Sequence, residues 1–173
     1  MSTPRGMTSL QRVLVKPEAG PFVAILQSIA PRFAGAPEAE LKRYAVLYLA
    51  TLAVLIPLDF LFLGLVAKDF FTSQVGNMLG EIKLVPAILF YLLYIVGIVI
   101  FVNGAAGASW QSTLLYGALF GLFCYATFEL TSMSLLKNWS WAVVVVDVAW
   151  GSFVTAVAST AGLLIANWLA PEI

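Results

Sequence analysis

The sequence predicts an all-α integral membrane protein, an up-down four-helix transmembrane bundle with an interfacial N-terminal segment. Of its 173 residues 61% are hydrophobic and 10% are charged, whereas a soluble domain is closer to about half apolar and about a quarter charged. Four apolar stretches are each long enough to cross about 30 Å of hydrocarbon, which takes roughly 20 helical residues. The excess apolar surface is therefore expected to face lipid.

The four predicted spans belong to one unit, residues 44–173, and residues 1–43 form an N-terminal extension. The spans are 44–66, 84–102, 112–133 and 142–170. Because the links between them are short, consecutive spans are expected to be antiparallel neighbours. An even number of spans places both termini on one side of the membrane.

The N-terminal extension contains an apolar stretch between two prolines, Pro21 and Pro31. It is too short to span the bilayer and too apolar to stay in water, so it is expected to lie at the membrane interface or on a partner protein. Pro37 then opens a helix, because proline is favoured at the first helical position and Glu38 follows at the positive end of the helix dipole.

Basic residues concentrated before the first span predict that both termini face the cytoplasm, matrix or stroma. Residues 1–17 contain three basic residues and no acid, a composition typical of organellar targeting peptides. The predicted location is a mitochondrial or other organellar inner membrane, with a bacterial inner membrane as the alternative. Trp139, Trp141 and Trp168 near the span borders are interpreted as lipid anchors.

The composition also excludes several classes of chemistry. The chain has no histidine and one cysteine, so a Ser-His-Asp triad, a His-ligated haem and an internal disulfide are all ruled out. Its scattered basic residues form no stripe that could bind nucleic acid. We assign no catalytic residue, no metal and no cofactor.

Three acidic residues lie inside predicted spans: Asp59, Glu129 and Asp147. An ionised carboxylate at the bilayer centre costs about 2.5 to 3.5 kcal/mol, so these side chains are expected to face the interior of the bundle. Counting 1.5 Å per residue from the span ends places them roughly 6–10 Å inside the face opposite the N-terminus, the depth at which Tyr91 enters the second span. The spans therefore bring acidic and phenolic groups to one layer.

The predicted polar cluster in this layer has two interpretations. It consists of Asp59, Tyr91, Tyr94, Tyr125, Glu129, Thr131, Asp147 and Trp150. It is either a set of satisfied hydrogen bonds that locks the bundle, or a functional pocket for a lipid headgroup, a proton or a cation. Di-metal carboxylate sites in bundles usually add histidines, which this chain lacks.

Small residues predict where the spans approach most closely. Gly117 and Gly121 form a GxxxG pattern in the third span, and Gly151 and Gly162 share a face of the fourth. Small residues let helix backbones approach each other, so these two spans are expected to pack tightly.

Motifs from all four spans, in order, resemble a known family. They are LDFLFLG around Asp59, FYLLYIVGIVIF at 90–101, YATFELTS at 125–132 and DVAWG at 147–151. The chain resembles the domain of unknown function 2177 family of small four-span predicted membrane proteins, with an added N-terminal extension. Where that family usually has Asp-Leu-Thr-Asn, this chain has Glu129 to Ser132. The resemblance implies the four-span fold and no particular activity.

The sequence is compatible with three functions. The first is a non-catalytic accessory or structural subunit of a larger, organellar membrane complex, which contacts lipids and binds other subunits through residues 1–43. The alternative is a membrane-embedded lipid-binding or lipid-modifying protein that uses Asp59, Glu129 and Asp147. A small proton- or cation-coupled carrier is a third interpretation, although four spans show no inverted repeat.

Overall fold

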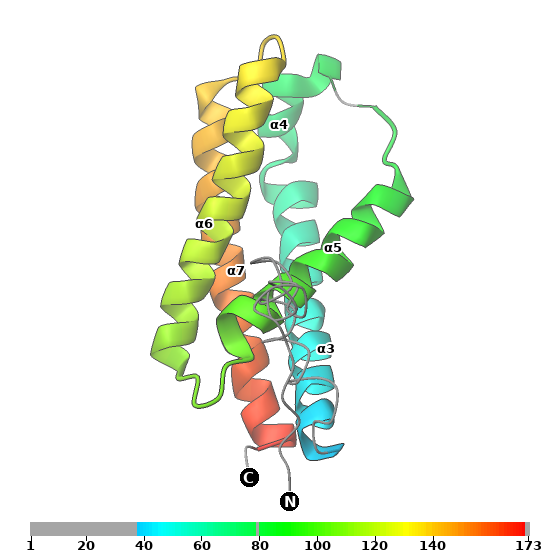
Figure 1. The fold of residues 1–173 in the computed structure, drawn as a ribbon. Helices are drawn as coiled ribbons and strands as arrows, with labels where there is room; N and C mark the ends of the chain where they lie inside the picture. The colour runs from blue at the N-terminus through cyan, green and yellow to red at the C-terminus, as the bar shows by residue number, and fades with distance from the viewer. Residues whose placement is uncertain (1–37, 79, 172–173) are drawn as a thin grey trace, which may run out of the picture. The chain divides into compact units, whose positions relative to one another are not determined.

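Every regular element in the part of the chain that the structure describes is a helix. The structure, a computed structural model, describes residues 38–78 and 80–171 (Figure 1). The elements are α3 (Glu38–Leu61), the π-helical turn η1 (Phe62–Val66), α4 (Lys68–Val75), the 3-10 turn η2 (Gly76–Met78), α5 (Leu84–Ile98), the π-helical turn η3 (Val99–Asn103), α6 (Trp110–Leu135) and α7 (Trp141–Leu169). The predicted interfacial stretch at 21–31 lies outside the described residues.

Four helical segments are long and apolar enough to cross a membrane, which confirms the predicted four-span, all-α fold. They are Glu38–Val66, Leu84–Asn103, Trp110–Leu135 and Trp141–Leu169. The last three agree with the predicted spans within two residues at each end. In the described part of the chain the first helix runs from Glu38. Pro37, which the sequence predicts to open this helix, lies outside the described residues.

Two elements in the first link were not predicted, α4 and the short turn η2. Val75 at the end of α4 and Ala67 before its start are buried. The Ser140 hydroxyl, at the N-cap of α7, donates a hydrogen bond to Gln74 Oε1 at 2.8 Å. These contacts hold α4 beside the start of α7, at the end of the bundle where the acidic residues lie.

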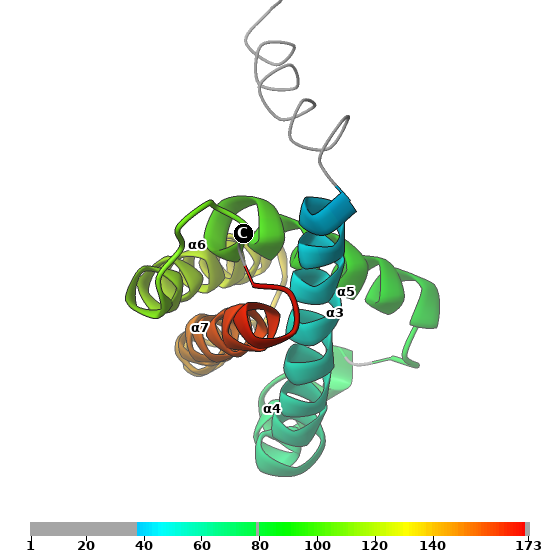
Figure 2. The same ribbon diagram turned by 90° about the horizontal axis from the view of Figure 1, so that it is seen from below.

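α6 and α7 pack backbone against backbone, and both views show them side by side (Figures 1 and 2). A Cβ atom on Gly121 would collide with the Gly151 carbonyl oxygen, and one on Gly117 would lie 3.0 Å from the Ala156 Cα atom. The tight packing predicted for the third and fourth spans is confirmed. Lipid is as apolar as these side chains, so close packing rather than the hydrophobic effect holds the two helices together.

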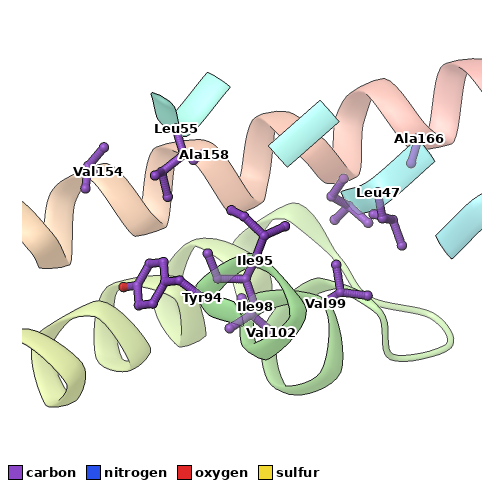
Figure 3. Packing of buried hydrophobic residues seen from close by; sticks show 11 residues of the cluster. Leu47, Leu55, Tyr94, Ile95, Ile98, Val99, Val102, Val154, Ala158 and Ala166 are labelled. Atoms are coloured by element: carbon purple, nitrogen blue, oxygen red, sulfur yellow. The ribbon is translucent and has the colours of Figure 1, made fainter. Parts of the chain in front are cut away.

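α7 is the central helix of the bundle. In α7, 44% of an apolar 18-residue stretch is buried, against 22–28% of the corresponding stretch in each of the other three spans. Its other faces meet α3, where Gly162 packs against Thr51, and α5. Figure 3 shows the apolar core between α3, α5 and α7. Its buried members are Leu47, Leu55, Tyr94, Ile95, Ile98, Val99, Val102, Val154, Ala158, Leu163 and Ala166.

Asn103 fixes the end of the second span. It is fully buried at the end of η3. Its side-chain amide donates to Thr51 Oγ1 at 3.2 Å and to the Ser159 carbonyl oxygen at 3.1 Å. One side chain therefore ties η3 to both α3 and α7.

We expect Gly121→Ala to destabilise the fold, because its added methyl group overlaps the Gly151 backbone. Overpacking of this kind costs about 1–3 kcal/mol. Gly64→Ala is the matched control, since nothing lies within 4 Å of a Cβ atom at that position. Thermal unfolding of the purified protein in detergent should show a lower melting temperature for Gly121→Ala alone. Equal melting temperatures for the two variants would contradict the close helix contact.

Candidate functional site

Asp59 joins three of the four spans. Its side chain, near the end of α3, is 4% exposed. Its Oδ2 atom accepts a hydrogen bond from the Tyr91 hydroxyl of α5 at 2.7 Å, and its Oδ1 atom accepts one from the Trp150 indole of α7 at 2.8 Å. Both oxygens therefore have donors from the protein, as a carboxyl group in hydrocarbon requires.

The Trp150 ring is held in place by a stacked partner. Phe62, the first residue of η1, lies parallel to it, with ring centroids 3.9 Å apart and an interplanar angle of 7°. Offset stacking fixes the plane of the indole. The N–H group of Trp150 therefore keeps its direction toward Asp59.

Glu129 and Asp147 form a second group between α6 and α7. Glu129 is 1% exposed, and its Oε2 atom accepts a hydrogen bond from the Trp139 indole at 2.8 Å. The Asp147 carboxyl is half-buried and lies within electrostatic range of the Glu129 carboxyl.

Trp139 was interpreted from the sequence as a lipid anchor, and the structure corrects this. Its N–H group donates to a buried acid ten residues earlier in the chain. The preceding residue, Asn138, has a φ of 65°, a left-handed conformation that asparagine tolerates better than most residues. The tight turn at Asn138 thus returns Trp139 toward α6. Asparagine in so short a link was the one sequence signal for this turn.

Tyr94 is buried and fully hydrogen-bonded. Its hydroxyl lies 2.7 Å from Thr155 Oγ1. Because Thr155 donates its own proton to the Gly151 carbonyl oxygen at 2.6 Å, Tyr94 is the donor in the first contact. This bond fixes the middle of α5 against α7.

Tyr125 belongs to the same layer but makes no hydrogen bond with either acidic group. Its ring lies against Gly151, where a Cβ atom would collide with it, and meets the Tyr94 ring edge-on with centroids 6.2 Å apart. Its hydroxyl is within electrostatic range of Asp59 and Asp147, yet it has no hydrogen-bond partner among the described residues. This phenol can therefore bind something else.

Thr131 does not join the cluster. It is exposed, and its hydroxyl donates to the Thr127 carbonyl oxygen of its own helix at 2.6 Å. Two residues correspond to about 200° around a helix, so Thr131 faces outward when Glu129 faces inward. We define the acid layer as the other seven predicted residues together with Trp139: Asp59, Tyr91, Tyr94, Tyr125, Glu129, Trp139, Asp147 and Trp150.

The acid layer contains no basic side chain. The lysines nearest to it in the sequence, Lys68, Lys83 and Lys137, lie in the links and are exposed. Within residues 38–78 and 80–171, the three acids do not form a group of three that could hold a metal ion. They form two groups: Asp59 with its two donors, and Glu129 with Asp147.

Residues 44–164 match the family model described as Predicted membrane protein (DUF2177), which is more than half of the chain. The chain belongs to this family. The resemblance noted in the sequence is thereby confirmed, and every residue of the acid layer lies inside the part that DUF2177 covers. No curated protein and no solved structure matches the chain.

We expect Trp139→Phe to destabilise this DUF2177 protein, because it leaves a buried carboxylate oxygen of Glu129 without its donor. An unpaired buried polar group costs about 1–3 kcal/mol. Trp141→Phe, two residues later, is the control, since Trp141 is 64% exposed. Thermal unfolding in detergent should separate the two. A stability loss that was equal in both variants would return Trp139 to the role of a lipid anchor.

Proposed function

We propose that this protein is a membrane-embedded binding protein whose acid layer holds the polar headgroup of a lipid. The most direct support is that the residues of the acid layer differ in whether their hydrogen-bonding groups already have partners. Asp59 and Glu129 are buried and accept hydrogen bonds from protein donors. The half-buried Asp147 and the Tyr125 hydroxyl, which has no partner among the described residues, can still form hydrogen bonds. A headgroup that bonds to both would remove the cost of unpaired polar groups at this depth.

The charge of the acid layer limits the class of headgroup. Three carboxyl groups with no basic side chain among them repel a bare phosphate and attract a positive charge or a hydrogen-bond donor. The proposed ligand therefore presents a hydroxyl or amine group to Asp147. The carboxyl groups of Asp147 and Glu129 would also provide a general acid and a general base if the protein modifies that lipid.

We expect the purified protein to retain a lipid with a hydroxyl- or amine-bearing headgroup, detected by native mass spectrometry. Asp147→Asn and Tyr125→Phe should each lower the retained fraction by about tenfold or more, because a hydrogen bond to a charged group is worth about 1.5–3 kcal/mol. Asp69→Asn on α4 and Tyr116→Phe on α6 are matched controls at exposed positions and should retain the lipid.

Melting temperatures of all four variants separate a loss of binding from a loss of folding. Tyr125→Phe is the more decisive variant, because it removes a hydroxyl that has no partner in the described protein and should leave the fold unchanged. Lipid retention by a folded Tyr125→Phe protein at the unaltered level would refute the proposed site.

A second candidate function is an accessory subunit of a larger membrane complex. Residues 1–43 lie outside the stretch that matches the DUF2177 family, and we propose that they bind other subunits in a mitochondrial or other organellar inner membrane. This role is compatible with lipid binding in the bundle, since it uses a different part of the chain.

The subunit proposal predicts that the full chain, extracted in mild detergent, migrates on native gels far above its own mass of 18.7 kDa. The same partner proteins should appear in independent affinity purifications of the tagged chain. Migration as a single chain with lipid alone would rule out this role and leave the lipid-binding proposal intact.

A further inference from the structure

The first half of α5 is almost unpacked. Every residue from Leu84 to Phe90 is exposed except the half-buried Ala87. A helix packed along its length buries about one residue in each turn on the packed side. Both ribbon views show the start of α5 standing apart from α6 and α7 (Figures 1 and 2).

The second half of α5, by contrast, is firmly anchored. Ile95 and Ile98 are completely buried. A Cβ atom on Gly97 would lie 2.9 Å from the Phe120 ring of α6. The following turn, η3, is π-helical and is held by the two hydrogen bonds of Asn103. Short π-helical stretches often occur at functional sites, and this one gives α5 a fixed end about which its other end can move.

Few contacts hold the loose half against the bundle. The Tyr91 hydroxyl bonds to Asp59 at 2.7 Å, and the exposed Tyr48 hydroxyl donates to the Leu92 carbonyl oxygen at a longer 3.2 Å. Phe90 stacks on Tyr94 one turn later in the same helix, with ring centroids 5.3 Å apart, so this contact is internal to α5. Of the two hydrogen bonds, the one from Tyr91 to Asp59 is the shorter, and it joins α5 directly to the buried acid on α3.

A ligand could also reach the acid layer from the end of the bundle, but more side-chain contacts close that route. Trp139 bonds to Glu129, and Gln74 of α4 is tied to Ser140. Ala67 and Val75, on either side of α4, are buried. A ligand therefore meets fewer contacts when it arrives beside α5, from the bilayer.

We propose that the first half of α5, Leu84–Leu93, is a lateral gate through which a lipid headgroup passes from the bilayer to the acid layer, and that the Tyr91–Asp59 hydrogen bond is its latch. This inference rests on the proposed lipid-binding function. It identifies the source of the ligand as the bilayer and Tyr91 as a positioning residue that controls access.

The native cysteine can test the gate. Cys124 is the chain's one cysteine. It is half-buried on α6, one turn beyond Phe120, on the side that packs against the core cluster with Tyr94. Since α5 and α6 are antiparallel and Phe120 meets Gly97, Cys124 lies toward the loose half of α5. Its rate of reaction with maleimides therefore reports how often that half moves away.

The experiment uses the full chain in liposomes and two reagents, the uncharged N-ethylmaleimide and a sulfonated maleimide that does not enter bilayers. Tyr91→Phe keeps the ring but removes the latch, so the uncharged reagent should label Cys124 about tenfold faster or more. Tyr116→Phe, an exposed phenol on α6, is the matched control and should label at the wild-type rate. The sulfonated reagent should stay slow in every protein.

Two results would overturn the gate. The first is an unchanged labelling rate in a Tyr91→Phe protein that keeps its wild-type melting temperature. The second, measured on the wild-type protein alone, is equally fast labelling by the sulfonated reagent, which would place the access route in water. Neither measurement detects bound lipid. The gate can therefore fail while lipid retention persists, and lipid retention can fail while the gate is found.

Discussion

Hydrocarbon offers no hydrogen bonds, so a carboxyl group inside a bilayer depends on donors from the protein itself. In this structure the Asp59 carboxylate obtains them from α5 through Tyr91 and from α7 through Trp150. Because both donors must reach one side chain, the three helices are fixed at matching depths. Apolar packing alone does not fix depth, since lipid solvates an apolar helix as well as a neighbouring helix does. The buried acid therefore determines the register of the bundle.

The close approach of α6 and α7 links helix packing to the site. Gly151 has no side chain, so its backbone meets Gly121 and its surface receives the Tyr125 ring. That contact holds the phenol ring against α7 and the apolar core instead of outward in lipid. A stripe of small residues, which usually serves packing alone, here also positions a polar group that has no partner among the described residues.

The depth of the acids could be predicted from the sequence, because it follows from helical rise and from the cost of a charge in lipid. The sequence was a poorer guide to which side chains donate hydrogen bonds to these acids. Trp139 lies near a span border, as lipid anchors do, and its inward direction depends on the left-handed turn at Asn138. Thr131 shares a motif with Glu129 but not its helix face. The unpacked start of α5 has no sequence signal at all, because residues that face lipid and residues that face other helices are equally apolar.

Because lipid-facing and helix-facing surfaces are equally apolar, a hydrogen bond can serve as the latch of a lateral gate. In water, moving a helix away from its bundle exposes apolar surface at a large cost in free energy. In a bilayer the same movement exchanges contacts with helices for contacts with acyl chains, and the apolar surface contributes little to the difference. The equilibrium then depends on the few polar contacts that must break. For the first half of α5 the shortest of these is the bond between Tyr91 and Asp59, one of the two that satisfy the buried acid.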